Sequence, residues 1–274
     1  MITAHTDKAL LFRSLHSSAN PLALANAWDV ASARVIEAAG APAIATTSAG
    51  IAWSLGRPDG ETLSPDQVVD LIARIVAAVE VPVTADIEGG YGRDAAGVGE
   101  TVTRVLEAGA VGVNIEDGTR PPAELRARLT AARAAAERAG GPLFLNARTD
   151  TYLFGLGDPA TRLEDTLERA RGYVDAGADG IFVPGVTDPA TITELAAGIS
   201  VPLNVMAGPG APAVAELGRL GAARVSLGSG VAQSAYTATR LAAQQLYGAG
   251  DYHPLVGAIP FPELNGLFLN PPRP

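Results

Sequence analysis

The sequence has no cysteine, a single lysine and only three histidines. Without cysteine there are no disulfides, no zinc thiolates and no thiol nucleophile. The only lysine, Lys8, lies near the N-terminus, which disfavours Schiff-base chemistry because that chemistry needs a lysine inside the site. His5, His16 and His253 lie near the chain ends, so an imidazole general base in the body of the protein is disfavoured too. The groups that remain for catalysis are carboxylates, arginine, tyrosine, hydroxyl groups and a hard metal ion.

Excess positive charge and long apolar runs are also missing. The 29 acidic residues outnumber the 20 basic ones, and the resulting net charge of −9 disfavours nucleic acid or an anionic membrane as partner. No stretch of roughly 18 apolar residues predicts a membrane span. The apolar run at residues 9–12 is too short for the core of a signal peptide. These absences predict a cytoplasmic protein, and the lack of cysteine fits a reducing compartment.

Short apolar runs alternate with helical patterns along the chain. Eight such runs in 274 residues predict a single α/β domain over residues 1–274, a (β/α)₈ TIM-type barrel with a short N-terminal extension and a C-terminal helical extension. An open doubly wound sheet is the alternative, but no G-x-G-x-x-G follows the first run. The predicted strands are residues 21–26, 43–47, 81–87, 112–117, 143–150, 180–185, 201–207 and 224–229.

Acidic residues collect where the predicted strands end, which is where barrels of this kind carry their chemistry. Alternation along a strand places Asp86 and Glu88 on one face, and Glu116 ends the next strand. Three carboxylates so close would repel one another, and a divalent cation would neutralise them. Oxygen ligands without histidine or cysteine suit Mg²⁺ or Mn²⁺, in part through water. The structural alternative is an ion-pair cluster with Arg148, or carboxylates that cap the helices after the strands.

Arg148 ends the fifth predicted strand, and its planar guanidinium can grip a carboxylate through two parallel hydrogen bonds. Pairing with Asp150 or Glu116 is the structural alternative. Segment 47–50 after the second strand is small and rich in hydroxyl groups, so its backbone N–H groups can approach an anionic ligand closely. Both features point to an anionic substrate.

Seven motifs follow one another over roughly residues 8–245: Asn26-Ala27-Trp28-Asp29, Thr46 to Gly50, Ser54 to Gly60, Asp86 to Gly92, Asn114 to Asp117, Asn146 to Asp150 and Pro202 to Met206. Together they resemble the isocitrate lyase and phosphoenolpyruvate mutase superfamily. The resemblance implies a (β/α)₈ barrel with Mg²⁺ and a 2-oxo or 2-hydroxy acid substrate.

The resemblance also implies roles for individual residues. It implies that Asp86 binds the metal directly, that Glu88 and Glu116 hold it through water, and that Arg148 grips the substrate. We predict Arg148, Glu116 and Tyr91 as the catalytic residues. The predicted substrate-binding residues are Thr47, Ser48, Ala49, Gly50, Asp59, Asp86, Arg148 and Asn204.

The sequence departs from the superfamily's carbon–carbon lyases in the loop after Asp117. Those lyases carry a K-[KR]-C-G-H loop there, whereas residues 118–124 read G-T-R-P-P-A-E. The lysine/asparagine loop of the phosphonate enzymes is missing as well, and Gly185 stands where the lyases use a glutamate. A true isocitrate or methylisocitrate lyase is therefore disfavoured.

The motifs and the departures together predict a Mg²⁺-dependent lyase that cleaves or decarboxylates a small 2-oxo or 2-hydroxy acid through an enolate. A metal-bound water, Tyr91 or Tyr152 would supply the proton. One alternative is phosphorus–carbon chemistry on phosphonopyruvate, as a mutase or hydrolase, and another is a 2-oxo acid binding protein with little catalysis. The superfamily tends to swap a terminal helix, and the tail is apolar at residues 259–261 and 267–269, so a homodimer or homotetramer is expected.

Overall fold

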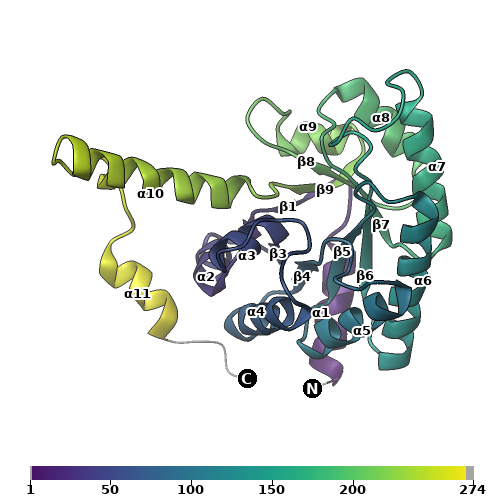
Figure 1. The fold of residues 1–274 in the computed structure, drawn as a ribbon, viewed down its shortest axis with the longest axis horizontal. Helices are drawn as coiled ribbons and strands as arrows, with labels where there is room; N and C mark the ends of the chain where they lie inside the picture. Colours follow the sequence, from purple (N-terminus) through teal and green to yellow (C-terminus); the bar gives the residue numbers. More distant parts are fainter. Residues whose placement is uncertain (1, 270–274) are drawn as a thin grey trace.

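Nine short parallel strands form the centre of the molecule (Figure 1). The computed structural model describes the backbone of residues 2–269 and the side chains of residues 5–269, so residue 1 and residues 270–274 of the predicted domain lie outside the described residues. The strands are β1 (Leu22–Leu24), β2 (Asn26–Ala27), β3 (Ile44–Thr46), β4 (Val83–Asp86), β5 (Gly112–Glu116), β6 (Phe144–Arg148), β7 (Gly180–Val183), β8 (Leu203–Met206) and β9 (Ala222–Ser226).

The sheet closes on itself through its first stave. The strand order is β1-β9-β8-β7-β6-β5-β4-β3-β2, and all neighbours are parallel. β1 and β2 are consecutive in the chain and are separated only by Ala25, so one stave pairs with β9 through its first half and with β3 through its second half. The predicted strand at residues 21–26 is thus two short strands, and the predicted (β/α)₈ TIM-type barrel is confirmed.

Helices cover the outside of the barrel and bury the apolar outer face of the strands (Figure 1). Val113 and Ile115 of β5, for example, lie in one buried cluster with Leu125 and Leu129 of α6. A capping box at Ser64 begins α4, where a side-chain oxygen satisfies a backbone N–H that the helix leaves free. The helices are α2 (Val30–Ala38), α3 (Ser48–Ser54), α4 (Pro65–Ala78), α5 (Ala95–Glu107), α6 (Pro122–Ala139), α7 (Arg162–Asp175), α8 (Pro189–Gly198) and α9 (Val214–Arg219).

The N-terminal extension is a helix, α1 (Ile2–Ser14), that closes the N-terminal end of the barrel (Figure 1). Phe12 is fully buried and packs edge-on against Phe144 of β6, with ring centroids 5.6 Å apart. Leu22 and Leu24 of the first stave belong to the same cluster. Apolar side chains thus fill most of this end of the barrel.

His16, just after α1, is a neutral histidine held in this apolar end. Its ring stacks on Phe144 at 4.1 Å, and its Nδ1 donates to the Phe12 carbonyl at 2.9 Å. Burial, together with the charge of Arg224, lowers the pKa of His16 from 6.5 to about 4. The unfolded chain therefore takes up a proton below pH 6.5 that the folded chain does not take up until about pH 4.

We expect this histidine to make the fold less stable as the pH falls from 6.5 to 4, by about 3 kcal/mol in total. The free energy of unfolding of the wild type and of His16→Gln, measured by urea titration at several pH values, checks this. The difference between the two proteins should be constant above pH 6.5 and should shift in favour of the variant below it. A difference that stays constant down to pH 4 would contradict the assignment.

The C-terminal extension is an arm that leaves the barrel (Figure 1). It consists of α10 (Gly230–Gly248), the short 3₁₀ helix η1 (His253–Leu255) and α11 (Phe261–Leu269). Only Ala232 of α10 is buried, whereas Tyr247 and Phe261 expose about four fifths of their surface. At the far end α11 returns to α2, where the Arg34 guanidinium donates to the Leu267 carbonyl.

Among residues 2–269 no helix is long and apolar enough to cross a membrane.

Candidate active site

A small polar cavity lies at the C-terminal ends of the strands. Its volume is about 180 Å³. A larger hollow of about 520 Å³ lies beside Pro21 and Val214 at the other end, but Arg219 is the only charged residue lining it. The chemistry therefore points to the smaller cavity, at the end where such barrels are active. It is lined by Asn26, Thr47, Ser48, Ala49, Asp59, Asp86, Asn114, Arg148, Leu153, Phe182, Met206, Ser226, Gly228 and Ser229.

Asp86 is the last residue of β4, and its carboxylate faces this cavity. The backbone N–H of Ser48 donates to Oδ2 at 3.2 Å, and that of Glu88 donates to Oδ1 at 3.4 Å. Thr46 fixes the backbone by accepting the N–H of Asp86 at 2.8 Å. Within residues 5–269 no arginine, lysine or histidine forms an ion pair with Asp86. Asp86 is therefore a rigidly held carboxylate whose charge is free to meet a cation.

Arg148, the last residue of β6, is held by two carboxylates. Parallel pairing of β5 and β6 sets Glu116 beside Arg148, and Nη1 lies 2.8 Å from the Glu116 carboxylate. Nε lies 2.7 Å from Asp150. Among the described residues, Nη2 has no hydrogen-bond partner. Both structural alternatives considered for Arg148 are thus present, and they aim the guanidinium while leaving one nitrogen for a ligand.

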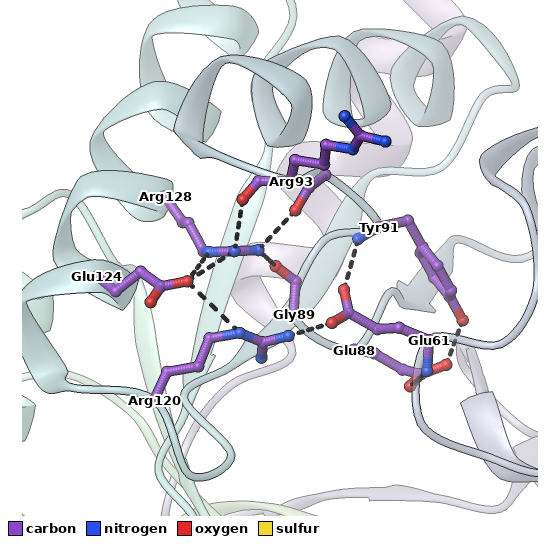
Figure 2. Close-up of polar contacts among 9 residues, drawn as sticks. Glu61, Glu88, Gly89, Tyr91, Arg93, Arg120, Glu124 and Arg128 are labelled. Atoms are coloured by element: carbon purple, nitrogen blue, oxygen red, sulfur yellow. Dashed lines mark hydrogen bonds and ion pairs between the residues drawn. The ribbon is translucent and has the colours of Figure 1, made fainter.

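Glu88 does not continue the strand, so strand alternation does not describe its position, although its backbone N–H still contacts Asp86. β4 ends at Asp86, and Glu88 has a left-handed backbone with φ of 49°. Its carboxylate accepts from the Tyr91 hydroxyl at 2.5 Å and from the backbone N–H of Glu61 (Figure 2). Glu88 and Tyr91 lie beside the cavity rather than in its wall.

The charges of Arg148 and Arg224 balance the acidic side chains around the cavity only in part. Burial raises the pKa of Asp59, Glu88 and Glu116, to about 7 for Glu88, and the charge of Asp86 raises all three further. Arg148 opposes the shift of Glu116 but is shared with Asp150. A divalent cation would relieve this repulsion, and its preferred ligands are carboxylate oxygens.

The geometry fits a metal with few protein ligands. No group of three histidine, cysteine, aspartate or glutamate side chains in the described part of the chain is arranged to hold an ion directly. Mg²⁺ in proteins keeps several waters and uses one or two carboxylates. Asp86 as the direct ligand, with Glu88 and Glu116 acting through water, satisfies both facts.

Of the other predicted substrate-binding residues, some line the cavity and some do not. Thr47, Ser48 and Ala49 line it at the start of α3, as does Asp59. Gly50 does not line it: a Cβ there would lie 2.6 Å from the Cβ of Trp28, so this glycine serves close packing.

Asn204 does not line the cavity, but it contacts a residue that does. It is buried, and its Oδ1 accepts from the Ser226 hydroxyl, which does line the cavity. Sequence reasoning missed Ser226 and Phe182, because a serine and a phenylalanine on predicted strands carry no signal of function.

An eight-stave barrel with carboxylates and an arginine at its strand ends belongs to the class of TIM-barrel enzymes. The chain matches the family model described as phosphoenolpyruvate phosphomutase over residues 12–247. It therefore belongs to the phosphoenolpyruvate mutase family, within the isocitrate lyase/PEP mutase superfamily that was expected from its motifs.

Two relatives with stated activities are carbon–carbon lyases. The chain is 31% identical to 2-methylisocitrate lyase of Escherichia coli, over 70% of this chain and 67% of that protein. It is 32% identical to oxaloacetate decarboxylase of Ectopseudomonas mendocina, over 74% of this chain and 71% of that protein. An uncharacterized protein of Mycobacterium tuberculosis is 38% identical and covers 94% of this chain and 96% of its own. The protein is thus an enzyme of a superfamily of lyases and mutases.

The barrel and the arm both match a solved structure. A crystal structure from Burkholderia cenocepacia J2315, described as a lyase/mutase, superposes with a TM-score of 0.90 at 37% identity and covers 98% of each chain. The fold, arm included, is therefore shared with a structure of the same class.

Proposed function

We propose that the protein is a Mg²⁺-dependent lyase that cleaves or decarboxylates a small 2-oxo or 2-hydroxy acid. One observation carries this: Asp86 and Arg148 face one polar cavity of about 180 Å³. Pockets for drug-sized ligands measure about 300–1,000 Å³, so a smaller cavity suits an acid of a few carbon atoms. The activities of the two lyase relatives agree in reaction type.

Arg148 has the central role in this mechanism. When the bond between the carbon next to the oxo group (C3) and the carbon beyond it (C4) breaks, its electron pair forms a C2–C3 double bond. The carbonyl pair moves onto oxygen, and the product is an enolate. The guanidinium, fixed by Glu116 and Asp150, stabilises that negative charge through Nη2. Mg²⁺, when bound, supplies Lewis-acid polarisation of the oxo acid. The residues that would hold it are Asp86, Glu88 and Glu116.

The enolate then needs a proton on carbon, and Tyr91 is our candidate donor. Its hydroxyl donates to Glu88 beside the cavity, so it would deliver its proton to the enolate after turning from Glu88 toward the cavity. The loop after β5 has neither cysteine, lysine nor histidine, so it offers no alternative acid in the place where the superfamily's lyases carry one. Tyr152 is the other candidate, because the next residue, Leu153, lines the cavity.

The test is a substrate panel with the purified chain and Mg²⁺. We expect pyruvate, glyoxylate or CO₂ from one or more of oxaloacetate, 2-methylisocitrate and short 2-hydroxy dicarboxylates, and no product after EDTA treatment. Turnover of none of these acids, or turnover that EDTA leaves intact, would overturn the proposal.

A second candidate is phosphorus–carbon chemistry, favoured by the family model that matches the chain. Phosphonopyruvate belongs in the same panel for this reason. Release of phosphate or formation of phosphoenolpyruvate from it, without any carbon–carbon cleavage, would replace the first proposal by this one. Thermal stabilisation by 2-oxo acids without any product would instead indicate a binding protein.

We propose further that the protein is a homodimer or homotetramer. The arm exposes a run of large apolar side chains that would be covered in an assembly. A sedimenting mass of one chain, 27.9 kDa, would rule this out. The exposed residues are Tyr236, Leu241, Leu246, Tyr247, Tyr252, Leu255, Val256, Ile259, Phe261, Leu264, Phe268 and Leu269.

A further inference from the structure

Three residues beside the cavity share an unusual backbone conformation. Glu61, Glu88 and Tyr91 have φ of 55°, 49° and 53°, and they are the only non-glycine residues with positive φ in the described part of the chain. This conformation costs about 1 kcal/mol or more for each such residue, and it persists only where surrounding contacts enforce it. Three such residues at one place indicate that contacts around them hold this part of the backbone in a strained conformation.

The three residues are joined in a closed ring of hydrogen bonds (Figure 2). The backbone N–H of Glu61 donates to Oε2 of Glu88, and the hydroxyl of Tyr91 donates to Oε1 of the same carboxylate. The backbone N–H of Tyr91 donates in turn to Oε1 of Glu61 at 3.0 Å. Both oxygens of Glu88 are thus held, and Glu61 takes part with its backbone and its side chain.

Arg120 binds the ring from outside, through Glu61. Its Nη2 pairs with Oε2 of Glu61, and its guanidinium lies on Gly89, where a Cβ would come within 2.5 Å of Nη1 (Figure 2). With any other residue at position 89, the end of the Arg120 side chain would have to shift from its present place. Arg120 lies in the loop after β5, so its ion pair connects that loop to the segment that carries Glu61, while its guanidinium contacts the turn that carries Glu88.

A second arginine supports the turn from α6. Glu124 is shared by Arg120 at 3.5 Å and Arg128 at 2.7 Å. Arg128 donates to the carbonyls of Gly89 at 2.6 Å and Gly92 at 3.2 Å (Figure 2). The turn is therefore held from both sides, and Glu61 is its contact with the segment that carries Asp59.

We propose that Glu61 is a positioning residue that sets the orientation of the Glu88 carboxylate, and that Arg120 holds Glu61 in place for this role. The inference rests on the proposed function, in which Glu88 supports the metal. Glu61 does not line the cavity, and both its oxygens are engaged within the ring, so it acts through Glu88 rather than on substrate.

The experiment measures Mn²⁺ affinity of the full chain by the electron paramagnetic resonance signal of free Mn²⁺. Glu61→Gln keeps size and the acceptor for Tyr91 but loses the charge that pairs with Arg120. Arg120→Gln removes the same pair from the other side. Each is expected to weaken Mn²⁺ binding about 3- to 10-fold, less than the roughly 10–100-fold effect of groups that contact a direct metal ligand, because Glu88 acts through water.

The double variant gives a readout that a general loss of stability would not. If Arg120 acts through Glu61, then Glu61→Gln/Arg120→Gln binds Mn²⁺ no more weakly than Glu61→Gln alone. The matched control is Arg104→Gln, which breaks the exposed Arg104–Asp66 pair and should leave Mn²⁺ affinity unchanged. If Glu61→Gln does not fold, Arg120→Gln against Arg104→Gln decides the matter.

The outcomes separate the inference from the proposed function. Mn²⁺ affinity that is lost in Asp86→Asn but unchanged in Glu61→Gln and Arg120→Gln overturns the inference alone. A wild-type protein that binds no Mn²⁺ overturns the metal-dependent function, and the positioning role falls with it. Additive losses in the double variant overturn the link through Arg120.

Discussion

Asp86→Asn is expected to lower kcat/KM by about 10³-fold or more, with loss of Mg²⁺ activation. Asparagine keeps the shape and one of the two oxygens that accept from the backbone N–H groups of Ser48 and Glu88. It removes the negative charge that would bind the cation. A factor of 10³ corresponds to about 4 kcal/mol of transition-state stabilisation, within the several kcal/mol that a bound metal contributes. The fold should survive, because the change removes one charge from a crowded acidic cluster.

The measurement is kcat/KM on the best panel substrate across a Mg²⁺ titration, with the thermal midpoint recorded for each protein. Asp70→Asn is the matched control, since Asp70 makes only an exposed ion pair with Arg74 on α4. The control should behave as wild type in both measurements. Near-normal activity of Asp86→Asn, with the same Mg²⁺ dependence, would remove Asp86 from the metal site.

The barrel could be predicted because each stave repeats one local pattern. Apolar runs of strand length, separated by helical patterns, are a signal that the chain repeats eight times, so errors at single residues do not change the result. The split first stave could not be foreseen, because the change of partner at Ala25 is set by barrel closure and not by the local sequence.

The positions of site residues could be predicted where the residue lies in a strand, but not where it lies in a turn. Glu116 and Arg148 each lie at the end of a predicted strand, so they could be expected close together. They are paired side by side in β5 and β6. Glu88 lies past the end of its strand, in a left-handed turn that depends on Glu61 and Arg120 from distant loops. No local pattern reports such contacts, so the alternation rule failed there.

Arg148→Lys is expected to lower kcat/KM by about 10²–10³-fold, the effect of removing one group that stabilises a developing negative charge. Lysine keeps the positive charge between Glu116 and Asp150, but a single ammonium group cannot contact both carboxylates and a ligand in the planar arrangement of a guanidinium. The loss should fall mainly on kcat if Arg148 acts on the enolate, and mainly on KM if it only anchors the substrate.

The control for this substitution is Arg133→Lys. Arg133 is also partly buried and bonded to several acceptors, including the carbonyls of Gly177 and Leu143, but it lies toward the opposite end of the barrel. This control should lower the thermal midpoint without changing kcat or KM. If Arg148→Lys instead keeps kcat/KM within about threefold of wild type, charge alone suffices at this position and the directed Nη2 contact has no role. A kcat loss in Arg148→Lys that is absent in Arg133→Lys would assign the effect to the fork of nitrogens that Glu116 and Asp150 hold toward the cavity, because both substitutions make the same chemical change.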